Sequence, residues 1–95
     1  MKSIATPHQS LHAVLSGIKR RAESLWPDDY VMQVHEVEQQ SAAYERLQQI
    51  QHQDVPQAIV EKLRAKAVID WKDDYVMQLF NIDQQISAYK KLHQQ

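Results

Sequence analysis

Two pairs of adjacent carboxylates are the residues of this sequence best suited to chemistry. Asp28-Asp29 and Asp73-Asp74 each lie inside a repeated W-x-D-D-Y-V-M-Q segment. Paired carboxylates can act as general acid and base or bind a hard cation. Aspartate is also preferred at helix N-termini, where its oxygens accept backbone N–H groups. No catalytic partner stands nearby in the sequence, so we predict that both pairs cap helices.

Histidine offers a second candidate chemistry. His8 and His12 are spaced i, i+4 on one helical face, which suits a metal such as zinc or nickel. No third ligand accompanies them, and the HExxH signature of zinc proteases is absent. The remaining histidines have no ligand spacing; they are His35, His52 and His93. We therefore predict surface histidines and no metal site.

Nucleophilic and cofactor chemistry lack their usual sequence signals. Zero Cys excludes thiol catalysis and thiolate metal sites, and a single Gly excludes a glycine-rich phosphate loop. No serine follows the pattern of a strand-to-helix nucleophile elbow. The serines considered lie in helical pattern; they are Ser10, Ser16, Ser24, Ser41 and Ser87. We predict a non-enzymatic protein that uses no cofactor.

Composition narrows the class of protein further. The 95 residues carry 11 Lys+Arg against 12 Asp+Glu, and 43% of them are hydrophobic. A net charge of −1 argues against a dedicated DNA-binding domain, and the scarcity of Gly argues against an all-β fold. No apolar run approaches the ~20 residues of a membrane helix, and no secretory signal is apparent. We expect a soluble protein of the cytoplasm.

An internal repeat is the most informative feature of the sequence. The segment from Trp26 to Leu47 aligns without gaps to the segment from Trp71 to Leu92, and twelve positions are identical. We call these two segments, with the residues upstream of each, copy one and copy two. Arrays of helical pairs need about three repeats for stability, so two copies favour a pseudo-symmetric pair.

Copy one predicts two helices. The first begins near Thr6-Pro7, with Thr6 as its N-cap, and Pro27 interrupts it. Its predicted apolar face is Leu11, Leu15, Ile18, Ala22 and Leu25. The second begins at Asp28-Asp29 and runs to about His52. Its predicted inward stripe is Tyr30, Val34, Val37, Ser41 and Tyr44.

Copy two predicts another helical pair, starting near Asp54 and Pro56 and again at Asp73-Asp74. The predicted apolar contacts of the third helix are Ile59, Leu63, Ala67 and either Ile69 or Trp71. The stripe of the fourth is Tyr75, Leu79, Ile82, Ile86 and Tyr89. We predict an all-α fold of two hairpins, 1–53 and 54–95, that form one compact domain. The hairpins pack as a pseudo-two-fold four-helix bundle or, alternatively, exchange between chains to form a homodimer.

Positions where the copies differ are candidates for function. Copy two is the more apolar, with Val68 and Ile69 in place of Glu23 and Ser24 and Phe80 in place of His35. These residues fall away from the predicted core stripes, and Val76 points to the same side as Phe80. A contiguous exposed apolar patch marks an interface. We predict that another chain binds Val68, Ile69, Val76 and Phe80; the alternative is that copy two packs more deeply against the rest of this chain.

Basic residues support a second hypothesis. Lys19 and Arg21 in copy one are equivalent to Arg64 and Lys66 in copy two, and under a two-fold axis they form a symmetric basic patch for phosphates. The predicted function is a small protein-interaction module, such as an adaptor, inhibitor or assembly factor of a bacterium or phage, that binds a protein partner or itself. The alternative is a nucleic-acid-associated regulator. The many glutamines are predicted to lie on exposed helix faces.

Overall fold

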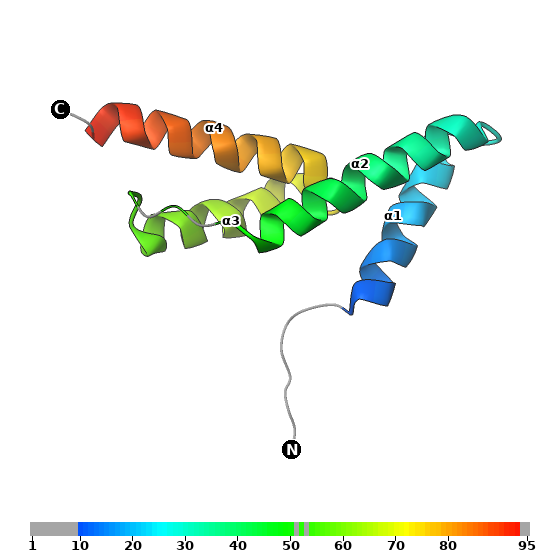
Figure 1. Ribbon diagram of the computed structural model, residues 1–95, viewed down its shortest axis with the longest axis horizontal. Coiled ribbons are helices and arrows are strands. Elements are labelled where there is room, and N and C mark those ends of the chain that lie inside the picture. The colour runs from blue at the N-terminus through cyan, green and yellow to red at the C-terminus, as the bar shows by residue number, and fades with distance from the viewer. Residues whose placement is uncertain (1–9, 51, 53, 94–95) are drawn as a thin grey trace, which may run out of the picture. The chain divides into compact units, whose positions relative to one another are not determined.

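The computed structural model describes residues 10–50, 52 and 54–93, and within those residues it contains four helices and no strand. The helices are α1 (Leu11–Leu25), α2 (Tyr30–Gln48), α3 (Gln57–Trp71) and α4 (Tyr75–His93) (Figure 1). The predicted all-α fold with four helices is confirmed. The chain divides into two compact units, unit 1 (Met1–Val37) and unit 2 (Glu38–Gln95), and the boundary falls inside α2.

The two copies have helices of matching length. α1 and α3 have 15 residues each, and α2 and α4 have 19 residues each. α2 and α4 begin at the equivalent residues Tyr30 and Tyr75. The repeat seen in the amino-acid sequence therefore extends to the secondary structure.

α1 begins and packs differently from the prediction. Its N-cap is Ser10, whose Oγ accepts the N–H of Ala13 at 3.1 Å, while the predicted cap Thr6 lies outside the described residues. Three residues of the predicted apolar face are exposed: Leu11, Leu15 and Leu25. The buried residues are Val14, Ile18 and Ala22. The buried stripe of α1 is therefore narrow, with one residue in each turn.

The turn after the first helix of each copy depends on the residue after tryptophan. Pro27 fixes its own φ near −65° and disfavours helical geometry at Trp26, so α1 ends at Leu25 and Asp28 takes a positive φ of 64°. Lys72 stands in the place of Pro27 in copy two. It takes the positive φ itself, at 41°, and α3 continues one residue further, to Trp71.

Unit 2 has a contiguous apolar core. α3 and α4 lie side by side as an antiparallel hairpin (Figure 1). The buried residues of this core are Leu47, Val55, Val60, Ala67, Ile82 and Ile86. Half-buried neighbours complete it: Ile50, Ile59, Leu63, Tyr75, Leu79 and Tyr89. The predicted stripe of α4 is confirmed, whereas Ile69 and Trp71 at the end of α3 are exposed.

α2 buries a face that the sequence analysis did not select. Its buried residues are Gln40, Ala43 and Leu47. Tyr30 and Val34, predicted to face inward, are exposed, and the rest of the predicted stripe is half-buried. The helix also ends at Gln48 rather than His52. The prediction for the start of this stripe is wrong because the second half of α2 packs in unit 2, where Leu47 joins the core.

The predicted hairpins, 1–53 and 54–95, stay predictions, and the boundary between the two compact units falls inside α2. The last part of α2 belongs to unit 2, together with α3 and α4. The pseudo-two-fold arrangement of the two hairpins in one compact domain, and its exchanged alternative, stay predictions.

Candidate functional site

The second aspartate of each pair caps a helix in both copies. Oδ1 of Asp29 accepts the N–H of Met32 at 3.1 Å, and Oδ1 of Asp74 accepts the N–H of Met77 at 3.2 Å. Each carboxylate satisfies a backbone donor that has no partner inside the first helical turn. The first aspartate of each pair, Asp28 or Asp73, lies exposed in the turn. The capping interpretation is confirmed for Asp29 and Asp74.

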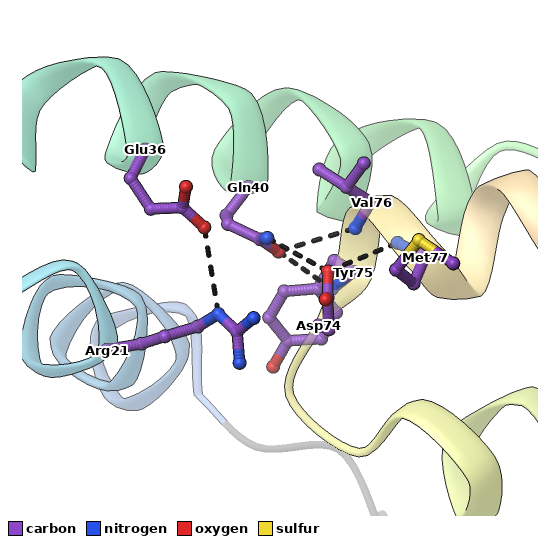
Figure 2. A network of polar contacts seen from close by, with 7 residues as sticks. All are labelled: Arg21, Glu36, Gln40, Asp74, Tyr75, Val76 and Met77. Carbon is purple, nitrogen blue, oxygen red and sulfur yellow. Dashed lines mark hydrogen bonds and ion pairs between the residues drawn. The ribbon is translucent and has the colours of Figure 1, made fainter. Parts of the chain in front are cut away.

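Among the described residues of unit 2, Gln40 has the most deeply buried polar side chain. It is 2% exposed, and both ends of its amide are bonded. Oε1 accepts the backbone N–H groups of Tyr75 at 2.7 Å and Val76 at 3.3 Å, while Nε2 donates to Oδ1 of Asp74 at 3.0 Å (Figure 2). A side chain on α2 in copy one thus closes the N-terminus of α4 in copy two.

This role of Gln40 was not predicted, because the glutamines were assigned to exposed helix faces. The available signal was identity: Gln39-Gln40 and Gln84-Gln85 are conserved between two copies that differ at several neighbouring positions. In each of the two turns, another glutamine side chain also bonds to the backbone. Nε2 of Gln33 donates to the carbonyl of Trp26 at 2.9 Å, and Nε2 of Gln78 donates to the carbonyl of Lys72.

An aromatic pair lies beside the Gln40 contact. The rings of Tyr44 and Tyr75 meet edge to face with centroids 5.1 Å apart and planes at 72°. Burial raises the pKa of the Tyr75 hydroxyl above its ordinary value of 10.0, and the neighbouring Tyr44 and Asp73 raise it further. Tyr75 therefore stays a neutral packing residue at physiological pH.

The four basic residues of the nucleic-acid hypothesis differ in what they contact. Nη1 of Arg64 donates to the carbonyl of Leu47 at 2.6 Å, at the end of α2. Nζ of Lys66 lies 3.0 Å from Oδ2 of Asp70, one helical turn away. In unit 1, Nε of Arg21 lies 3.7 Å from Oε2 of Glu36 (Figure 2). Lys19 is exposed.

The apolar candidate residues lie at the same end of the α3–α4 hairpin. Val68 and Ile69 occupy the last turn of α3, and Phe80 follows the first turn of α4. Ile69 is 73% exposed and Phe80 is 56% exposed, while Val68 is also exposed. Val76 is half-buried, with its N–H directed to Gln40. We call Val68, Ile69 and Phe80 the apolar patch.

Within the described residues, no group of three or more His, Asp or Glu side chains is placed to hold a metal ion. His12 is exposed on α1, and its predicted companion His8 lies outside the described part of the chain. None of the described helices has the length and apolar character needed to cross a membrane.

Comparison with known proteins finds no family model, no curated protein and no solved structure that matches this chain.

Proposed function

We propose that this chain is a non-enzymatic helical module that works by binding another protein through the apolar patch. The observation that carries the proposal is the exposure of three large apolar side chains at one end of the α3–α4 hairpin. Apolar surface gains about 25 cal/mol for each Å² removed from water, so such a patch favours a protein partner with apolar side chains of its own.

The comparison between copies supports this assignment. Copy one has the polar residues Glu23, Ser24 and His35 at the positions of Val68, Ile69 and Phe80. The hairpin therefore does not require large apolar side chains at these positions, since α1 and α2 form with polar ones. A role outside the fold of the hairpin accounts for their presence in copy two.

The contacts of the basic residues disfavour the nucleic-acid alternative. Arg21, Arg64 and Lys66 each lie beside an acceptor of this chain, so binding a phosphate requires each to leave or share that contact. The net charge of −1 adds no general attraction for a polyanion.

The test uses copy one as the source of substitutions. A tagged chain is compared with the double variant Ile69→Ser, Phe80→His in capture from a lysate of the source cells, with nuclease treatment and at low and moderate salt. Both substitutions install the residue that copy one has at the equivalent position. His35→Ala, at the position equivalent to Phe80, is the matched control.

The proposal predicts a protein that the wild type and His35→Ala retain at moderate salt and that the double variant loses. Retention of the same proteins by the double variant contradicts the role of the apolar patch. Capture of nucleic acid alone, lost as salt is raised, favours the basic residues instead.

A further inference from the structure

The face by which copy one packs in unit 2 is repeated, residue for residue, in copy two. Four residues of α2 make this face in copy one: Gln40, Ala43, Tyr44 and Leu47. Identical residues stand at the equivalent positions of α4: Gln85, Ala88, Tyr89 and Leu92. We call the second set the donor face.

Three of the four equivalent pairs differ in burial, whereas Tyr44 and Tyr89 are both half-buried. Leu47 is 5% exposed and Gln40 and Ala43 are also buried. Leu92 is 73% exposed, and Gln85 and Ala88 are also exposed. The Tyr89 ring stacks on His93, with centroids 4.1 Å apart, whereas its equivalent Tyr44 packs on Tyr75. Gln85, Ala88 and Leu92 are thus exposed although their equivalents in copy one are buried, while Tyr89 keeps partial cover from the core of unit 2.

The cover of the copy-one face comes from copy two. Gln40 bonds to the start of α4, Tyr44 meets Tyr75, and Leu47 lies in one apolar cluster with Val60 and Leu79. Arg64 adds a hydrogen bond to the Leu47 carbonyl.

Copy one carries a counterpart of that covering surface. Leu15, Lys19, Tyr30 and Val34 stand at the positions of Val60, Arg64, Tyr75 and Leu79. We call these four residues the acceptor face. All four are exposed, and Tyr30 is 69% exposed, whereas their apolar counterparts in copy two are buried or half-buried. Each residue keeps the character of its counterpart: two aliphatic, one basic, one tyrosine.

We propose that a second copy of this chain covers these faces, with the donor face of one molecule bound to the acceptor face of the next. The contact repeats the one between copy one and copy two. The Gln85 amide bonds to the N-terminus of α2 at Tyr30 and Val31 and to the Asp29 carboxylate. Tyr89 exchanges its stacking on His93 for the Tyr30 ring, and Lys19 donates to the carbonyl of Leu92.

This association is head-to-tail, because the two faces are different surfaces of the same chain. Each associated pair leaves one donor face and one acceptor face exposed, so association continues into a linear array or closes into a ring. Arrays of helical pairs are stable from about three repeats, and two associated chains supply four copies of this hairpin.

The test measures mass in solution as a function of concentration, by sedimentation velocity or light scattering. Leu92→Glu places a charge on the donor face and Tyr30→Glu places one on the acceptor face, both at exposed positions. We expect the mass of the wild type to rise with concentration above the 11.1 kDa monomer and that of each variant to stay at the monomer value. An equimolar mixture of the two variants retains one intact donor face and one intact acceptor face, so it forms a dimer.

Two controls separate this inference from the proposed function. Phe80→His alters the apolar patch, and by helical spacing Phe80 lies on a different side of α4 from Gln85 and Leu92. It is expected to associate as the wild type does, as is His35→Glu. A wild type that stays monomeric across the concentration series overturns the inference. So does association of the wild type that the mixture of variants fails to restore.

Discussion

Gln40 and Tyr75 come from different copies of the repeat, and a hydrogen bond of 2.7 Å joins the side-chain oxygen of the first to the backbone N–H of the second. The same amide bonds to Asp74 and Val76, so one side chain fixes the first turn of α4 against α2. This contact stabilises unit 2 and also defines the geometry that the identical residue Gln85 can repeat.

Gln40→Ala is expected to lower the free energy of unfolding by about 1–3 kcal/mol, because it removes the acceptor of two partly buried N–H groups. Urea denaturation of dilute protein measures this change. Gln85→Ala is the matched control, and since Gln85 is exposed it is expected to change stability by less than about 0.5 kcal/mol. Equal effects of the two substitutions contradict the assigned role of Gln40.

The two capping aspartates, Asp29 and Asp74, are expected to contribute differently to the free energy of unfolding. Asp29→Ala removes a helix cap, which costs about 1 kcal/mol. Asp74→Ala removes the equivalent cap and also the acceptor of the Gln40 amide, so its loss is expected to be larger. Thermal and urea denaturation of both variants rank them. A larger loss of stability in Asp29→Ala than in Asp74→Ala contradicts this prediction.

The sequence predicted the elements of this chain better than it predicted the buried faces. The aspartate pairs predicted the N-termini of α2 and α4 closely, since each helix begins at the residue after its pair, because helix caps are local chemistry. The core stripe of α4 was also predicted, because its apolar residues recur at helical spacing and Ile82 and Ile86 are buried in the core of unit 2.

The buried face of α2 was predicted wrongly for a physical reason. Tyr30 and Val34 begin an apolar stripe at helical spacing, and Gln40, Ala43 and Leu47 form a second one beside it. Periodicity shows that each face suits burial, but the neighbour that packs on the helix decides which one is covered. Here Leu47 packs in the core of unit 2 and Tyr30 is exposed.

Lys72→Gly is expected to stabilise the protein by about 1 kcal/mol, because Lys72 holds a φ of 41° that glycine adopts without a steric cost. Urea denaturation measures the gain. Lys66→Gly, in the interior of α3, is the control and is expected to lose about 1 kcal/mol. A loss of stability in Lys72→Gly shows that the turn does not have this backbone conformation.

The ion pair between Asp54 and Lys90 can be tested through the titration of the Asp54 carboxyl group. Nζ of Lys90 lies 3.1 Å from Oδ2 of Asp54, and this hydrogen bond lowers the pKa of Asp54 below 3.8. A carboxyl group whose pKa is lowered by folding stabilises the protein at pH values above its ordinary pKa. This stabilisation is lost as the pH falls through the lowered, folded-state pKa.

Carbon-13 NMR of the Asp54 carboxyl group is expected to give a pKa below 3.8 in the wild type. Lys90→Gln is expected to raise it, because the hydrogen bond from Lys90 is the largest cause of the lowering, whereas Lys91→Gln, at the next position along α4, leaves it lowered. An unchanged pKa in Lys90→Gln disproves the pair in solution.

Binding of the captured protein partner, measured by titration at two salt concentrations, tests the central claim most directly. We expect Ile69→Ser, Phe80→His to weaken the wild-type affinity at least about tenfold, or about 1.4 kcal/mol, with little dependence on salt. Unchanged affinity in this double variant, together with a steep fall in wild-type affinity as salt is raised, contradicts a function based on the apolar patch.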